Sequence, residues 1–217
     1  MVSSFLYVPN LIGYLRVVAG FVSYTYASPH SSVHDPRVAF SLYLIGQALD
    51  VVDGFAARYL RQTSELGRVL DMVTDRASTT CLSLILASLY PHYLTLFCAL
   101  ITLDLFSHWY HMHAALIGGA SSHKGSANWV VRLYYRRSVL FIVCAGTELW
   151  YLSLYAMYFV PDLMFSLPGG IALPLCRTLT MITTPIFAFK QVTNVVQLHV
   201  AMHTLVEIDA DAQRKAS

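Results

Sequence analysis

Residues 50–75 read DVVDGFAARYLRQTSELGRVLDMVTD, a stretch in which two pairs of aspartates flank a short basic link. Asp50 and Asp53 come near the end of one apolar segment, and Asp71 and Asp75 come near the start of the next. At about 100° per residue, the two members of each pair lie on one face of a helix. Because a short link makes consecutive helices antiparallel neighbours, the two pairs are expected to converge. The stretch therefore predicts two adjacent helices that share an acidic cluster.

The rest of the chain is strongly apolar. Of its 217 residues, 56% are hydrophobic and 12% are charged, whereas a soluble domain carries about 25% charged residues. The mean hydropathy is +0.55. A soluble protein of this length could not bury so much apolar surface, so we predict an integral membrane protein. The net charge of +2 is too small to indicate nucleic-acid binding.

Six apolar segments are separated by polar, Pro and Gly residues, and each is long enough to cross a bilayer as a helix. The predicted fold is therefore an all-α, polytopic membrane helical bundle with six transmembrane helices, forming a single domain over residues 1–217. The first segment lacks the basic start of a signal peptide, and we expect a retained helix. The expected spans are residues 11–27, 38–60, 67–90, 92–117, 139–160 and 170–188, with the last free to continue as helix beyond Lys190.

Basic residues gather on alternate links between these spans. They occupy the second link, the fourth link and the C-terminal tail: Arg58, Arg61 and Arg68; Lys124, Arg132, Arg136 and Arg137; Arg214 and Lys215. Lys and Arg favour the cytoplasmic side of a membrane. We therefore expect both termini and the acidic cluster on the cytoplasmic side.

Four carboxylates near one end of two membrane helices need compensation, since an acidic residue at the centre of a span costs roughly 2.5–3.5 kcal/mol. One compensation is pairing with the nearby Arg58, Arg68 and Arg76. The other is a bound cation, which four carboxylates at helical spacing favour. Oxygen ligands without His or Cys select a hard ion, so the pattern indicates Mg²⁺ or Mn²⁺.

The same stretch resembles the signature of the CDP-alcohol phosphatidyltransferase family, D-x2-D-G-x2-A-R-x8-G-x3-D-x3-D. It matches every fixed position without a gap, at Asp50, Asp53, Gly54, Ala57, Arg58, Gly67, Asp71 and Asp75. Eight fixed positions make a chance match negligible. The resemblance implies transfer of a phosphatidyl group from CDP-diacylglycerol to an alcohol, with release of CMP.

The resemblance also implies a role for individual residues. The four aspartates, Asp50, Asp53, Asp71 and Asp75, would hold one or two divalent ions that bridge the diphosphate of the donor. Asp75 would in addition be the base that deprotonates the attacking hydroxyl. The residues that would contact CDP-diacylglycerol are Gly54, Ala57, Arg58, Ser64 and Gly67.

Other stretches resemble the members of this family that use inositol as the acceptor. These are FLYVPNLIGYLRV at 5–17, LDMVTDRAST at 70–79, LDLFSHWYHMH at 103–113 and VVRLYY at 130–135. The resemblance implies CDP-diacylglycerol and myo-inositol as substrates and an endoplasmic reticulum or Golgi membrane, with the active site facing the cytoplasm. It leaves open whether the protein is a monomer or a homodimer.

Asp104, His108 and His111 recur at i, i+4 and i+7 on the fourth span, so one face of a membrane helix is polar. Such a face suits a polyhydroxylated ring, although these side chains could equally bond to neighbouring helices. Lys124 and Arg132 follow this span, and their alternative role is to anchor the chain on the cytoplasmic side. The acceptor-binding candidates are Ser107, His108, Lys124 and Arg132.

Several assignments stay open at this level. Asn10 and Arg16 on the first span fit either bonds into the acidic cleft or a structural role. Arg177 and Lys190 are basic residues within the last span that fit pairing with lipid phosphate. Glycerol 3-phosphate or serine would be an alternative acceptor. A divalent-cation transporter is an alternative of another class, although it would have no use for Gly54, Ala57 and Arg58.

Overall fold

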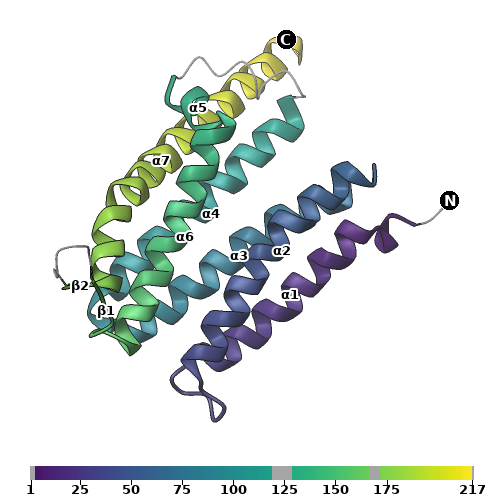
Figure 1. Ribbon diagram of the computed structural model, residues 1–217. Coiled ribbons are helices and arrows are strands. Elements are labelled where there is room, and N and C mark those ends of the chain that lie inside the picture. The colour runs from purple at the N-terminus through teal and green to yellow at the C-terminus, as the bar shows by residue number, and fades with distance from the viewer. Residues whose placement is uncertain (1–2, 119–128, 167–171, 217) are drawn as a thin grey trace. The chain divides into compact units, whose positions relative to one another are not determined.

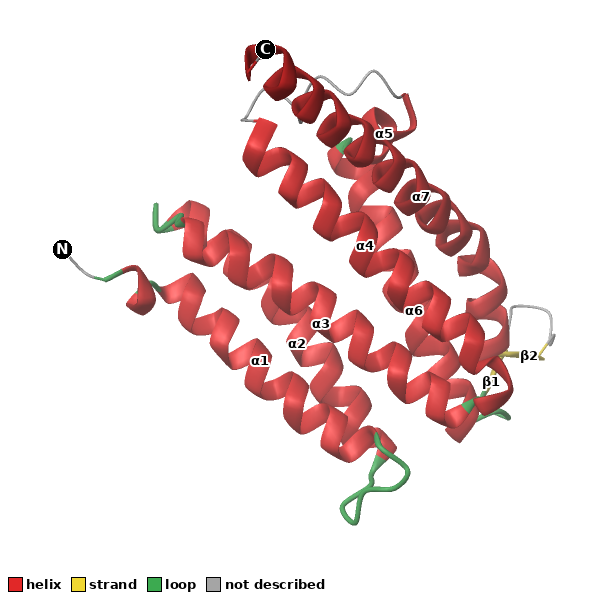
Figure 2. Ribbon diagram, turned by 180° about the vertical axis from the view of Figure 1, so that it is seen from behind, coloured by secondary structure: helices red, strands yellow, loops and turns green. Residues whose placement is uncertain are grey.

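The computed structural model describes residues 3–118, 129–166 and 172–216 (Figure 1). The described part is almost entirely helical, as predicted, and its one β-hairpin is small (Figure 2). The elements are η1 (Ser4–Leu6), α1 (Val8–Ala27), α2 (Pro36–Tyr59), α3 (Glu65–Leu89), η2 (Pro91–Tyr93), α4 (Leu94–Gly118), α5 (Trp129–Tyr134), α6 (Arg137–Phe159), β1 (Met164–Ser166), β2 (Ala172–Pro174) and α7 (Leu175–Ala216).

The six predicted spans correspond to α1, α2, α3, α4, α6 and α7. The start of the sixth span at residue 170 was wrong, because residues 172–174 form a strand that pairs antiparallel with β1. The N–H of Leu175 then donates to the carbonyl of Leu163 at 2.8 Å, and α7 begins there. Among the described helices, α2 and α6 are long and apolar enough to cross a membrane. The count of six spans and the orientation stay predictions.

The described residues group into two compact units, Met1–Leu94 and Thr95–Ser217. That the chain is a single domain stays a prediction. In the first unit, α1 packs along α2 and against α3. The contact with α3 is close at Gly13, where an added Cβ would lie 2.7 Å from Cδ2 of Leu70. A small residue at this point lets the two backbones approach each other.

In the second unit, α6 packs on α7 through aromatic side chains and through hydroxyl groups such as those of Ser153 and Thr180. The rings of Trp150 and Phe187 stack with their centroids 3.8 Å apart. Lys190 of α7 is buried and donates to Asn194 at 2.7 Å, with its ammonium 5.3 Å from the ring centroid of Tyr134. The structure therefore places Lys190 inside this unit, in polar contacts of its own, rather than on a lipid-facing surface.

The end of α2 is a turn that requires a left-handed residue. The N–H of Gln62 donates to the carbonyl of Ala57 at 3.0 Å, and the N–H of Arg61 donates to the carbonyl of Arg58 at 3.4 Å. This bond pair is a Schellman motif, which normally places Gly at the position that Arg61 occupies here with φ 53°. The turn sends the chain back toward α3, which Ser64 caps by accepting from the N–H of Gly67 at 3.0 Å.

The turn yields a stability prediction. Arg61→Gly and Arg61→Val both remove the positive charge, but a β-branched residue is strained at positive φ. We expect Arg61→Val to be less stable than Arg61→Gly by about 1–2 kcal/mol. Thermal unfolding of the two variants in the same detergent measures the difference, and equal midpoints would contradict the left-handed turn.

Candidate metal and nucleotide site

The two aspartate pairs converge in the first unit, which confirms the expectation from their spacing. They meet around Arg16 of α1, whose side chain is only 3% exposed. Its Nη1 lies 2.9 Å from Oδ2 of Asp53 and 2.9 Å from Oδ1 of Asp71. Its Nη2 lies 2.5 Å from Oδ1 of Asp50 and 2.6 Å from Oδ1 of Asp75. One guanidinium therefore pairs with all four carboxylates.

Helix α1 joins the two aspartate pairs. The sequence predicted that α2 and α3 would bring the pairs together as direct neighbours. In the structure α1 packs against both helices, and its Arg16 reaches the carboxylates of each. Arg16 was left open between a cleft and a structural role. Its contacts now place it in the acidic cluster.

Three of the carboxylates form a group that suits a metal ion. Asp50, Asp53 and Asp71 each offer an oxygen, and these oxygens lie within 4.8 Å of one another. The side chain of Asp71 is 51% exposed, whereas that of Asp53 is 10% exposed, so the group opens toward solvent at Asp71. An all-oxygen donor set with net negative charge fits a hard divalent cation. Asp75 pairs with Arg16 but is not one of these three, and its role as a ligand stays a prediction.

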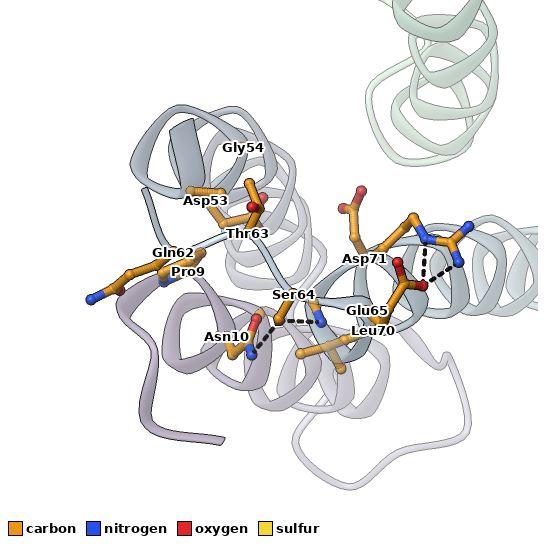
Figure 3. A pocket seen from close by; sticks show the side chains of 14 residues that line it. Pro9, Asn10, Asp53, Gly54, Gln62, Thr63, Ser64, Glu65, Leu70 and Asp71 are labelled. Carbon is orange, nitrogen blue, oxygen red and sulfur yellow. Dashed lines mark hydrogen bonds and ion pairs between the residues drawn. The ribbon is translucent and has the colours of Figure 1, made fainter. Parts of the chain in front are cut away.

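A pocket of about 530 Å³ lies against this cluster and is lined from within the first unit (Figure 3). Asp53 and Asp71 belong to both the pocket wall and the carboxylate group. The volume falls within the roughly 300–1,000 Å³ of small-ligand sites. A ligand in this pocket would thus lie directly beside a bound cation.

Four of the five predicted donor-contact residues line the pocket, namely Gly54, Ala57, Ser64 and Gly67. Arg58 is not among the lining residues. Its guanidinium lies close to Gly54, where an added Cβ would be 3.6 Å from Nη1 of Arg58. The structure therefore gathers these residues, while their contact with the donor stays a prediction.

A network between α1 and the start of α3 shapes one wall of the pocket (Figure 3). Asn10 is almost fully buried, and its Nδ2 donates to the carbonyl of Ser4 at 2.6 Å and to Oγ of Ser64 at 3.3 Å. An added Cβ on Gly67 would lie 2.5 Å from Oδ1 of Asn10 and 3.1 Å from Oγ of Ser64. Only glycine therefore fits at position 67 without displacing this wall.

The sequence interpretation missed several other residues of the pocket wall. Pro9, Gln62, Thr63 and Glu65 line it. The side chain of Gln62 also accepts from the N–H of Val8 at 2.9 Å, which ties the start of α1 to the link. Gln62 and Thr63 lie in the link between α2 and α3, which is too short to show a periodic pattern that would separate pocket residues from connecting ones.

The three described acceptor candidates, Ser107, His108 and Arg132, fall in the second unit and have unlike surroundings. Ser107 is fully buried and donates to the carbonyl of Asp104 at 3.0 Å. Nδ1 of His108 lies 2.8 Å from the same carbonyl and 3.5 Å from the Asp104 carboxylate. Arg132 is exposed on α5. Lys124 lies outside the described residues, and the acceptor role of all four candidates stays a prediction.

The helical fold and the assembled signature define a class of membrane-type lipid transferase: the chain belongs to the CDP-alcohol phosphatidyltransferase family, whose model matches residues 6–206. Within that class it is similar to the CDP-diacylglycerol--inositol 3-phosphatidyltransferase of Schizosaccharomyces pombe, at 40% identity across 98% of this chain and 94% of that protein. The Homo sapiens protein of the same name is 41% identical, with 97% and 96% covered.

A probable CDP-diacylglycerol--inositol 3-phosphatidyltransferase 2 of Arabidopsis thaliana is 35% identical, with 98% of this chain and 95% of that protein covered. No solved structure matches the chain. The family that residues 50–75 indicated is thus confirmed, and the names of these relatives contain inositol, the acceptor that the sequence predicted.

The tight wall at Gly67 yields a second prediction. Gly67→Ala should lower stability by about 1–3 kcal/mol, because its Cβ would force Asn10 and Ser64 apart. Gly46→Ala on α2 is the matched control, since an added Cβ there meets nothing within 4 Å. That control should be neutral or stabilising by up to about 1 kcal/mol. Thermal unfolding of both variants tests the pair, and a stable Gly67→Ala protein would contradict the packing.

Proposed function

We propose that this chain transfers the phosphatidyl group of CDP-diacylglycerol to myo-inositol, yielding phosphatidylinositol and CMP. The observation that carries the proposal is the assembly of the four signature aspartates around Arg16, beside a pocket lined by the signature glycines. The choice of inositol is supported by relatives of that name, which match nearly the full length of the chain.

The donor set of the cluster supports Mg²⁺ or Mn²⁺ as the cofactor. Asp50, Asp53 and Asp71 would hold the ion, because their oxygens lie close enough together to share one. When bound, such an ion neutralises charge that develops on the phosphoryl oxygens and on the departing CMP. Arg16 already balances one of the four negative charges, and the remainder attracts divalent cations.

Asp75 is the proposed general base. Its Oδ1 is held by Arg16 at 2.6 Å, and its side chain remains 34% exposed, so a hydroxyl can reach the carboxylate. The inositol hydroxyl gives its proton to Asp75 while its oxygen attacks the phosphorus of the diacylglycerol phosphate. A new P–O bond forms to inositol as the P–O bond to CMP breaks. A positioned carboxylate of this kind typically contributes 10²–10⁴-fold to rate.

The pocket residues would hold the nucleotide end of the donor. Gly54, Ala57 and Gly67 have small or no side chains, which lets a flat base or a diphosphate come close to the backbone. The N-terminus of α3 follows Ser64, and a helix start favours negative phosphate groups. Arg58 adds a positive charge next to Gly54.

The proposed setting is a membrane of the endoplasmic reticulum, with six spans, cytoplasmic termini and a cytoplasmic active site. Two apolar helices of spanning length, α2 and α6, support the membrane assignment. The basic residues near the aspartate signature support the cytoplasmic side. This placement lets soluble inositol meet a donor whose acyl chains remain in the bilayer.

The carboxylates give a direct test of the metal site. Replacement of Asp50, Asp53, Asp71 or Asp75 by Asn should slow CMP release by more than about 100-fold, because the charge that binds the ion or takes the proton is lost. Chelation with EDTA should abolish activity, and Mg²⁺ or Mn²⁺ should restore it.

Asp35→Asn is the control for this series. Asp35 caps the other end of α2 by accepting from the N–H groups of Arg37 and Val38, and Asn caps a helix about as well as Asp does. Its activity should stay near that of the wild type. Near-normal turnover by two or more of the four cluster variants would rule out the four-carboxylate site.

The acceptor is tested by a panel of alcohols with purified protein. CMP release should depend on myo-inositol, with little driven by serine or glycerol 3-phosphate, because a site built for hydroxyl groups rejects analogues lacking them. His108→Ala should raise the KM for inositol and leave that for CDP-diacylglycerol nearly unchanged. Preference for glycerol 3-phosphate would overturn the acceptor but not the reaction class. An unchanged KM would make His108 structural.

A further inference from the structure

Arg16 is a buried cation to which the proposed reaction assigns no step. It is the α1 residue that pairs with carboxylates of both α2 and α3. Its side chain is 3% exposed, and it is not among the residues that line the pocket. Arg16 therefore contacts the carboxylates from inside the protein, away from the pocket, and can influence the carboxylates but not contact a donor in the pocket.

The geometry divides the carboxylates evenly between the two ends of the guanidinium. Nη1 pairs with Asp53 and Asp71, and Nη2 pairs with Asp50 and Asp75. Each end therefore joins one carboxylate of α2 to one of α3. A guanidinium is a flat, rigid fork that can hold this arrangement, whereas a lysine ammonium is a single point charge.

Each of these contacts joins Arg16 to one carboxylate oxygen, namely Oδ1 of Asp50, Oδ2 of Asp53, Oδ1 of Asp71 and Oδ1 of Asp75. A carboxylate has acceptor capacity on both oxygens, so pairing with Arg16 does not exhaust it. A divalent ion and the guanidinium can thus share the same carboxylates. They repel each other, because both are cations a few ångströms apart.

We infer that Arg16 is a positioning residue: its guanidinium is an internal counter-cation that keeps the four carboxylates assembled without metal and weakens metal binding. The inference rests on the metal site of the proposed function, and it is independent of which alcohol is the acceptor. Without Arg16, the carboxylates of α2 and α3 repel one another until a metal arrives. With Arg16, part of that charge is already neutralised, so the ion binds less tightly and exchanges more readily.

The test compares Arg16→Gln, Arg16→Lys and the control Arg37→Gln with the wild type. Arg37 is exposed near the start of α2, 13 residues from Asp50, so its loss changes the net charge equally but about 20 Å away along the helix. All proteins are full-length, purified with Mg²⁺ and then stripped with EDTA. Thermal unfolding is followed with and without Mn²⁺, and Mn²⁺ affinity is measured by electron paramagnetic resonance.

We expect stripped Arg16→Gln to unfold at a lower temperature than stripped wild type, with Mn²⁺ recovering most of that loss. Its Mn²⁺ Kd should fall by roughly tenfold, since one nearby positive charge is gone. Arg16→Lys keeps the charge but not the fork. It should therefore lose stability when stripped, while its Kd stays within about threefold of the wild type. Arg37→Gln should match the wild type in both measurements.

Three results would overturn the inference. One is an equal loss of stability with and without Mn²⁺ in Arg16→Gln, as expected of a residue that only packs. Another is an Mn²⁺ Kd that is unchanged or weaker in that variant. If Arg16→Gln fails to fold even with Mg²⁺, Arg16→Lys decides, and a Kd weakened beyond threefold counts against the inference. Absence of Mn²⁺ binding by the wild type would instead refute the proposed metal site.

Discussion

Repulsion among four carboxylates is the constraint on which the first unit depends. Asp50 and Asp53 come from α2, and Asp71 and Asp75 come from α3, so the two helices cannot bring these residues together unless a cation lies between them. Arg16 supplies that cation from α1. A buried guanidinium is itself costly unless it is fully paired, so cation and carboxylates stabilise one another. The packing of these three helices and the assembly of the acidic site therefore depend on the same ion pairs.

The same three helices explain why the pocket forms at this end of the unit. The Schellman turn at Arg61 reverses the chain within a few residues, and Ser64 then caps α3. Asn10 of α1 donates to the Ser64 hydroxyl, and it lies so close to Gly67 that a side chain there would collide with it. Turn, cap and glycine thus fix a wall next to the carboxylates. This proximity between backbone and charge suits the nucleotide diphosphate of the proposed donor.

Residue spacing predicted which aspartates share a helix face and that the two pairs meet, but it did not predict that a third helix lies between them and supplies a cation. The faces of Asp50 with Asp53, and of Asp71 with Asp75, follow from helical period alone. The helical period does not indicate which neighbouring helix faces these aspartates, so the contacts of Arg16 with them could be found only in the packed structure. The short β1–β2 hairpin was missed for a related reason, since strands of three residues are too short to show alternation. Ser64 was found only through the family resemblance, although its place before Glu65 also suits a helix cap.

The division of the chain also bears on how one family serves several alcohols. Every fixed position of the signature, from Asp50 to Asp75, lies in the first unit, together with Arg16 and the pocket. These residues suit a metal and a nucleotide diphosphate, which are common to the whole reaction class. The acceptor candidates, Ser107, His108, Lys124 and Arg132, all lie in the sequence of the second unit. Under the acceptor role proposed for these residues, changes in residues 95–217 would alter acceptor choice and leave the donor site of the first unit unchanged. For this reason the signature alone identifies the reaction but does not name the alcohol.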